Sequence, residues 1–278
     1  MSITFSSCFY IIKSKFDATT YIEWMNNFLS IVNNFNLVIY TDLSSSKFIP
    51  DEGKENSRIK IILKPLEQFY NYKYKDYWIE NHKKNLLLND KSCWELNMVW
   101  AEKVWFVKDT VERKYFETDW YGWCDIGYFR NRAEDLHTYF LSTWPSKEKI
   151  MLLNREKIMY ACINNDVRYI QYLNNIVNTK NSHGLPLNPI PPHYNSVAGG
   201  FFILYKDKIY WWTKTFDVKL ELYFKNSYLV KDDQIILIDC IMSQQDHFTL
   251  FRENDPQFDN WFMFQRIFLP LENKPFHI

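Results

Sequence analysis

Three apolar segments and one amphipathic segment at the start of the chain constrain the fold more than any other feature. Residues 3–12, 36–42 and 59–66 are apolar runs of strand length, and Pro65 ends the last of them. Between the first two, residues 21–32 carry apolar side chains at helical spacing. Strand, helix and strand in this order predict an α/β domain with a mostly parallel central sheet flanked by helices.

The rest of the chain alternates in the same way. Helical patterns extend over residues 66–110, 134–144, 163–178, 207–224 and the apolar segment that begins near residue 231, whereas residues 149–154 have the pattern of a short strand. A chain of 278 residues, of which 47% are hydrophobic, is long enough to bury one large core. We therefore expect a single domain over residues 1–278.

Charge and cysteine content narrow the class of protein. Lys and Arg together number 33, as do Asp and Glu, so no net charge attracts nucleic acid and we expect no such partner. The five cysteines are far apart and show no CxxC or zinc-ligand spacing, which is typical of reduced, buried thiols. Because no signal segment and no run of about 18 apolar residues occurs, we expect a cytoplasmic chain without a membrane span.

The segment WCDIGYFR, residues 123–130, is the strongest candidate for a functional site. Trp123 and Cys124 suit a half-buried strand, which then gives way to Asp125, Gly127 and Arg130. In open α/β sheets, ligands bind beyond the carboxyl ends of the strands, where this acid would lie. The sequence therefore predicts a site around Asp125.

Two later segments add to this site. Gly199 and Gly200 are the only adjacent glycines and precede the apolar run FFILY, which indicates a close approach to the backbone, a tight turn or a bulge. Asp232 and Asp233 precede an apolar helical segment, where acids can also serve as helix caps. No GxGxxG or GxxxxGK[ST] sequence is present, so a nucleotide would be held by other means.

Taken together, these segments resemble the HtrL/YibB (WlaTC/HtrL) family, which is described as a family of glycosyltransferases. The resemblance rests on FYIIKSKF, YIEWMNNFL and NLVIYTD near the N-terminus, on WCDIGYFR, and on AGGFF followed by KDDQ. KDDQ departs from the family's usual Asp-Glu-Gln but keeps two carboxylates. The resemblance implies a GT-A-like fold, a nucleotide-sugar donor such as a UDP-sugar, a carbohydrate or other hydroxyl acceptor, and Mn²⁺ or Mg²⁺. It also implies a donor-binding half at about residues 1–130 and an acceptor or catalytic half at about residues 131–278.

The departing nucleoside diphosphate must be neutralised, and two ways of doing so remain open. One is a metal ion held by Asp125, alone or with His247, although the second acid of an Asp-x-Asp motif is missing. The other leaves Asp125 to bind ribose or sugar hydroxyls, while Lys13, Lys103 and Arg130 neutralise the diphosphate.

The remaining candidates concern the acceptor and the backbone beside the donor. Asp233, or else Asp232, is the candidate general base of an inverting transfer, and in a retaining transfer the same acids would bind sugar hydroxyls. Gly127, Gly199 and Gly200 are the candidate points of close contact with the donor.

Two other classes of function stay open. Because half of an Asp-x-Asp motif is missing, the same fold could bind a nucleotide sugar or a carbohydrate without catalysis. With 19% aromatic residues, the chain could also be a structural or interaction protein with a large aromatic core. Such a protein would have no deep polar pocket near Asp125.

Overall fold

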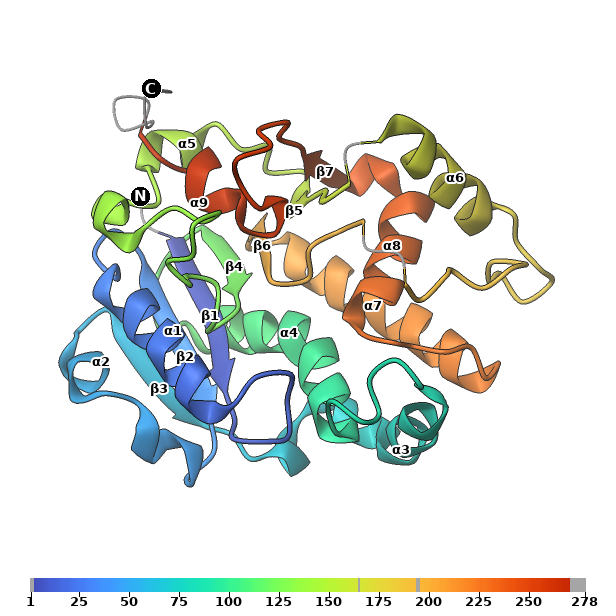
Figure 1. The fold of residues 1–278 in the computed structure, drawn as a ribbon, viewed down its shortest axis with the longest axis horizontal. Helices are drawn as coiled ribbons and strands as arrows, with labels where there is room; N and C mark the ends of the chain where they lie inside the picture. The colour runs from blue at the N-terminus through green and yellow to red at the C-terminus, as the bar shows by residue number, and fades with distance from the viewer. Residues whose placement is uncertain (1–2, 165, 194–195, 271–278) are drawn as a thin grey trace.

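A seven-stranded sheet runs through the centre of the molecule (Figure 1). The computed structural model describes residues 3–164, 166–193 and 196–270. In the order in which they lie side by side, the strands are β3 (Ile59–Leu63), β2 (Asn36–Thr41), β1 (Ile3–Phe9), β4 (Trp120–Cys124), β6 (Phe201–Tyr205), β5 (Ile158–Ala161) and β7 (Phe248–Phe251).

Within this sheet only β6 runs against the others. β1 pairs in parallel with β2 and β4, β2 pairs in parallel with β3, and β5 pairs in parallel with β7. β6 is antiparallel to both β4 and β5. The other strands therefore end at one edge of the sheet, and β6 begins at that edge directly after Gly199 and Gly200.

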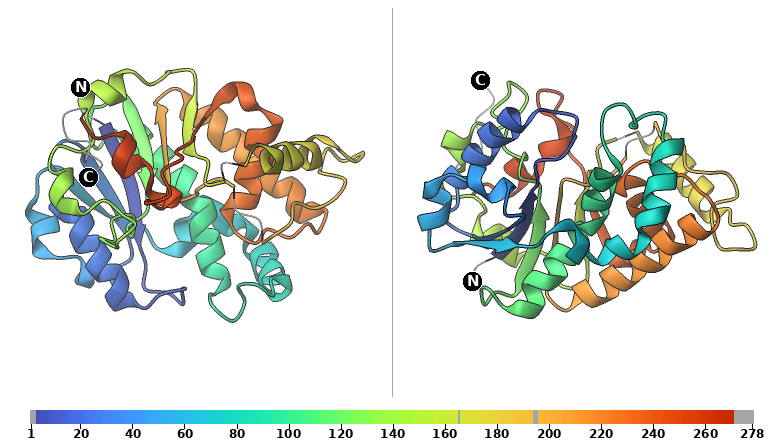
Figure 2. Two further views of the ribbon diagram at one scale, coloured as in Figure 1. Left: turned by 45° about the horizontal axis from the view of Figure 1, so that its top comes forward. Right: turned by 90° about the horizontal axis from the view of Figure 1, so that it is seen from below.

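Helices cover both faces of the sheet (Figure 2). The α-helices are α1 (Ala18–Ser30), α2 (Asp51–Glu55), α3 (Lys75–Lys84), α4 (Trp94–Arg113), α5 (Lys147–Met151), α6 (Val167–Asn178), α7 (Lys208–Lys225), α8 (Asp233–Ser243) and α9 (Phe264–Ile267). Short 3-10 helices are η1 (Ser45–Phe48), η2 (Leu66–Gln68), η3 (Tyr70–Tyr74), η4 (Thr138–Leu141), η5 (Gln245–His247) and η6 (Asn260–Phe262). None of these described helices combines the length and the apolar content needed to cross a membrane.

Side chains that alternate along the central strands fill two cores, one on each face of the sheet. Trp123 and Phe202 pack in the core that contains α4, α7 and α8. Phe5 and Phe201 pack in the opposite core, with α1 and α9. The fold class expected from the sequence, a single α/β domain with a mostly parallel sheet flanked by helices, is confirmed.

Two local predictions are wrong. The segment 149–154 was expected as a strand but contains the end of α5, because Ser146 Oγ accepts a hydrogen bond from Lys149 N and caps a helix there. A short apolar run fits either state, and the strand of this region is β5 instead. The segment 134–144 was expected to be helical but forms only the 3-10 helix η4.

Candidate active site

An open cavity of about 380 Å³ lies at the edge of the sheet where the parallel strands end. The loop after β1, α4, the end of β4, the start of β6, the start of α8 and residues 259–262 all contribute to its wall. Most of the predicted site residues line it: Lys103, Asp125, Gly127, Arg130, Gly199, Gly200, Asp232 and Asp233. The topology thus brings together segments that are far apart in the sequence.

A larger cavity, of about 990 Å³, opens at the opposite edge of the sheet. Its charged side chains include Arg58, Asp119 and Lys206, and Lys206 pairs with Asp119 at 2.7 Å. None of the predicted site residues lines this cavity. We therefore place the candidate active site at the smaller one.

Lys103 joins the two main acids of the site. Its side chain, on α4, is 8% exposed, and its Nζ lies 3.1 Å from Asp125 Oδ1 and 3.2 Å from Asp233 Oδ2. Nζ also donates a hydrogen bond to the carbonyl oxygen of Gly199 over 2.9 Å. Burial lowers the pKa of Lys103, but the two carboxylates more than reverse this, so the pKa is raised and the side chain is charged. The three N–H groups of the ammonium thus have three oxygen partners.

Asp125 follows β4 directly and is held in place by two further hydrogen bonds. Trp123 Nε1 donates to Asp125 Oδ1 over 2.6 Å, and the backbone N–H of Asp125 donates to the carbonyl oxygen of Gly200 over 2.9 Å. The side chain is 39% exposed. Because Lys103 and Trp123 both bind Oδ1, Oδ2 is the oxygen that a ligand in the cavity can use.

Asp233 is the first residue of α8 and is buried. Burial raises the pKa of its carboxyl group to about 6, Lys103 opposes the rise, and the charges of Asp232 and Asp125 add to it. At neutral pH the group is therefore mostly ionised. A carboxylate with a pKa close to the working pH is suited to accept a proton during a reaction.

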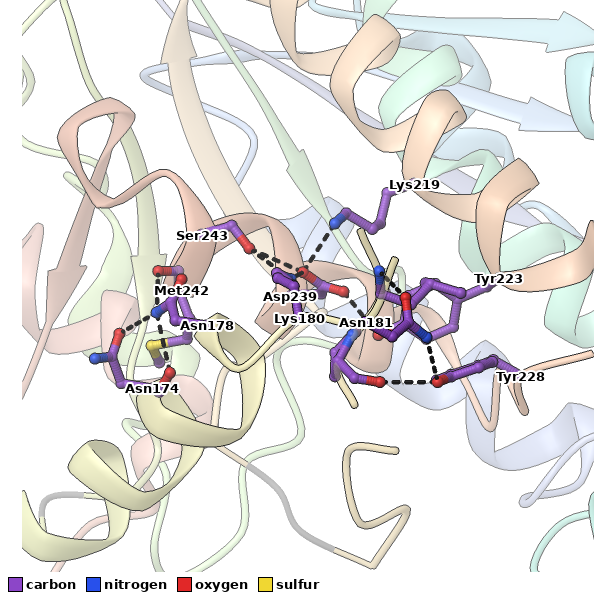
Figure 3. A network of polar contacts seen from close by, with 12 residues as sticks. Asn174, Asn178, Lys180, Asn181, Lys219, Tyr223, Tyr228, Asp239, Met242 and Ser243 are labelled. Carbon is purple, nitrogen blue, oxygen red and sulfur yellow. Dashed lines mark hydrogen bonds and ion pairs between the residues drawn. The ribbon is translucent and has the colours of Figure 1, made fainter. Parts of the chain in front are cut away.

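A buried polar network fixes α8 and with it the two acids at its start (Figure 3). Asp239, in the middle of α8, is fully buried, and its Oδ1 accepts hydrogen bonds from Lys180 Nζ and Ser243 Oγ, each over 2.9 Å. Lys219 Nζ lies 3.0 Å from the same oxygen, and the Tyr223 hydroxyl donates to Oδ2 over 2.9 Å. Because Lys219 and Tyr223 belong to α7, the network ties α8 to its neighbour.

Asp232 and Gln234 present buried acceptor oxygens at the cavity. Lys231 Nζ lies 3.1 Å from Asp232 Oδ2, whereas Asp232 Oδ1 and Gln234 Oε1 have no hydrogen-bond partner among the described residues. Asp232 stands at the start of α8, but its side chain makes no capping hydrogen bond. A buried acceptor without a donor is costly, which makes both oxygens candidates for hydrogen bonds from the hydroxyl groups of a ligand.

The paired glycines give space to the acids. A Cβ atom at Gly199 would lie 2.7 Å from Asp233 Oδ2, and one at Gly200 would lie 3.1 Å from Asp125 Oδ2. The close approach expected from the sequence is present, and the approaching groups are these carboxylates. At Gly127 a Cβ would lie 2.7 Å from the Trp24 ring. Contact of these glycines with a donor stays a prediction.

Two cations line the cavity without forming an ion pair within the described residues. Arg130 is half-buried, its guanidinium carbon lies 4.1 Å from the centre of the Trp24 ring, and its Nε donates to the carbonyl oxygen of Gly127. Lys15, in the loop after β1, lies over the Trp100 ring at 5.1 Å. Lys13, the lysine predicted from the sequence, is exposed and does not line this cavity.

His247 does not join Asp125. It precedes β7, whereas Asp125 follows β4, and these strands run in the same direction, so the two residues lie at opposite edges of the sheet. The imidazole stacks on the Trp211 ring with centroids 4.0 Å apart. The predicted metal site shared by Asp125 and His247 is therefore wrong.

The remaining side chains do not suit the Mn²⁺ or Mg²⁺ that the resemblance implies. Among residues 3–164, 166–193 and 196–270, no group of three or more His, Cys, Asp or Glu is placed to hold a metal ion. Asp125 and Asp233 are the two acids of this cavity that meet at one point, and Lys103 Nζ already lies between them. A metal ion that bridged these two acids would have to displace this ammonium.

Sequence comparisons give no family for this chain. No protein-family model matches it, and no curated protein matches it in sequence. Among solved structures, the crystal structure of mouse xyloside xylosyltransferase 1 in its apo form matches with a TM-score of 0.48 and 12% identity, over 89% of this chain and 85% of that chain. A likeness at this level carries no functional argument, and membership of the HtrL/YibB family stays a prediction.

Proposed function

We propose that this chain is a glycosyltransferase with a GT-A-like fold and a member of the HtrL/YibB family. In this proposal it moves a sugar from a nucleotide-sugar donor, such as a UDP-sugar, to a hydroxyl group of a carbohydrate or other acceptor. The observation that carries the proposal is the meeting of Asp125 and Asp233 on Lys103 in one open cavity at the carboxyl edge of the sheet.

The wall of this cavity supplies the chemistry that a nucleotide sugar needs. Arg130 and Lys15 provide positive charge for a diphosphate. Asp125 Oδ2, Asp232 Oδ1 and Gln234 Oε1 accept hydrogen bonds from sugar or ribose hydroxyls. Trp100 and Trp261 also line the cavity and offer aromatic faces on which a sugar or a base stacks.

Asp233 is the general base of this proposal. In an inverting transfer the acceptor oxygen attacks the anomeric carbon, and the bond from that carbon to the diphosphate oxygen breaks. The acceptor proton passes to the Asp233 carboxylate, and the departing diphosphate keeps the electron pair of the broken bond. The raised pKa of Asp233, about 6, makes its carboxylate a better base than an ordinary aspartate.

The ion pair between Asp233 and Lys103 favours a second candidate, a binding protein for nucleotide sugars or carbohydrates that does not catalyse transfer. A carboxylate at 3.2 Å from an ammonium is a weaker base than one without a counter-charge. A binding protein of this kind would bind the same nucleotide sugars or carbohydrates and would not release the nucleotide from a nucleotide sugar.

A screen of nucleotide sugars by thermal shift and calorimetry tests the proposal, because a ligand that binds only the folded state raises its melting temperature. We expect a UDP-sugar to bind and Asp125→Asn to weaken its binding at least tenfold. Asp119→Asn is the matched control. Asp119 directly precedes β4, the strand that Asp125 follows, and therefore lies at the other edge of the sheet. A folded protein that binds no nucleotide sugar would refute the proposal.

A further inference from the structure

We propose that Lys103 is a resident cation in the place of the divalent metal, and that Lys15 and Arg130 bind the donor diphosphate without metal. This inference rests on the proposed function, because it concerns the donor of the same site. It replaces the Mn²⁺ or Mg²⁺ expected from the sequence.

The first argument is the set of oxygens around Lys103 Nζ. It comprises Asp125 Oδ1 at 3.1 Å, Asp233 Oδ2 at 3.2 Å and the carbonyl oxygen of Gly199 at 2.9 Å. Carboxylate and carbonyl oxygens are the ligands that Mg²⁺ and similar hard cations prefer. In this chain they surround an ammonium that is covalently part of α4, so the protein carries its own counter-charge between the two acids.

The second argument is the consequence for an added metal ion. A divalent ion between Asp125 and Asp233 would lie within a few ångströms of the Lys103 ammonium. Because the Lys103 side chain is only 8% exposed, repulsion between the two cations would be strong. Asp125 Oδ1 also accepts a hydrogen bond from Trp123 Nε1 over 2.6 Å and is thus already engaged twice. A metal ion that bridged the two acids would therefore have to replace contacts that Lys103 and Trp123 already make.

The third argument is the charge that remains for the diphosphate. Lys103 is balanced by two carboxylates, and Lys231 pairs with Asp232 at 3.1 Å. Lys15 and Arg130 line the same cavity, and neither forms an ion pair with a described residue. They lie on the Trp100 and Trp24 rings, which hold cations without neutralising them.

Titration of the wild-type protein with MnCl₂ and with UDP tests the inference directly. We expect no heat of Mn²⁺ binding by calorimetry and less than a twofold difference in the UDP dissociation constant between EDTA and Mn²⁺. UDP binding that is lost in EDTA and restored by Mn²⁺ would overturn the inference and leave the proposed function standing. A protein that binds neither UDP nor any nucleotide sugar would instead refute the proposed function.

Substitution of Lys103 provides a second test, which does not depend on turnover. Lys103→Ala leaves Asp125 and Asp233 without their shared cation, so we expect Mn²⁺ to raise the melting temperature of the variant by several degrees. Mn²⁺ should not raise the melting temperature of wild type or of Lys108→Gln, a change of a half-buried residue on the same helix that does not line the cavity. An equal rise in the melting temperature of wild type on addition of Mn²⁺ would contradict the inference. Should Lys103→Ala fail to fold, the wild-type titration decides alone.

The diphosphate assignment has its own test with UDP and uridine. Lys15→Gln and Arg130→Gln should each weaken UDP binding about tenfold and leave uridine binding unchanged, because only UDP carries the diphosphate. Lys108→Gln should change neither affinity. Unchanged UDP binding in both site variants would overturn the assignment.

Discussion

The structure explains why glycine occupies positions 199 and 200. The carboxylates of Asp233 and Asp125 fill the space that a side chain would need there. A Cβ at Gly199 would approach Asp233 Oδ2 to 2.7 Å, whereas a Cβ at Gly200 would approach Asp125 Oδ2 to 3.1 Å. We expect Gly199→Ala to lower the free energy of unfolding by about 1–3 kcal/mol through overpacking, and Gly200→Ala to cost less. Chemical denaturation measures both values, and equal stability of Gly199→Ala and wild type would contradict this account.

The raised pKa of Asp233 predicts how the reaction depends on pH. A general base works only when it is deprotonated, so turnover should rise as the pH passes through about 6 and should level off above pH 7. The measurement is kcat for a UDP-sugar substrate between pH 5 and 8. A rate that stays constant across this range, or falls, would exclude Asp233 as the base.

At the scale of elements, the position of the two acids depends on the attachment of α8 to α7. Asp239→Asn leaves Lys180 and Lys219 in a buried site without their counter-charge, which we expect to cost about 3–5 kcal/mol of stability. A lower urea midpoint, together with weaker UDP binding, is the expected result. Asp246→Asn, an exposed acid beyond the end of the same helix, is the control. If the Asp239→Asn protein is destabilised but binds UDP as wild type does, the network around Asp239 does not position the acids of the site.

Glu102 joins α4 to η3 and gives a second prediction at this scale. It is fully buried and accepts hydrogen bonds from the backbone N–H groups of Tyr70 and Asn71. Burial raises its pKa to about 7, against the opposing effects of Lys64 and these hydrogen bonds, so the folded state binds this proton more tightly than the unfolded state. Its contribution to stability is complete below about pH 4.5 and is lost as the pH rises through 7.

Glu102→Gln tests this contribution, because glutamine does not titrate. Between pH 5 and pH 8 the free energy of unfolding of the variant, relative to wild type, should rise by up to about 3 kcal/mol, at about 1.4 kcal/mol for each pKa unit. Denaturation at the two pH values measures the difference. Glu112→Gln, on the exposed side of the same helix, should show no such gain. A gain that is equal at both pH values would contradict the prediction.

At the scale of the whole molecule, the sequence predicts the layout of the sheet edge better than the contacts on it. The first three strands and α1 follow from apolar patterns that are local, and Asp125 lies at the carboxyl end of β4 as its sequence context predicts. The paired glycines and the two acids at the start of α8 also line the same cavity. The position of a residue relative to a strand or helix depends on the residues next to it, so it can be predicted from a single sequence.

Contacts between segments that are far apart in the sequence cannot be predicted in the same way. The reversed direction of β6, and the separation of His247 from Asp125 across the sheet, depend on pairings that no local pattern encodes. The same limit explains why the sequence predicts Lys13 and not Lys15, since both stand in the loop after β1 and only the folded chain shows which one lines the cavity. Likewise, the sequence predicts Lys103 as a partner of the diphosphate, because no local pattern shows that Asp125, after β4, and Asp233, at the start of α8, both meet its ammonium.

The central claim is sugar transfer at Asp233, and the most direct measurement is UDP release from a panel of UDP-sugars by wild type and Asp233→Asn, with a panel of carbohydrate acceptors and with water as the acceptor oxygen. We expect wild type to release UDP from at least one donor, and Asp233→Asn to lower kcat at least a hundredfold with little change in KM, as the loss of a general base predicts. UDP-sugars that bind to wild type without any release of UDP, or full turnover by Asp233→Asn, would contradict the claim.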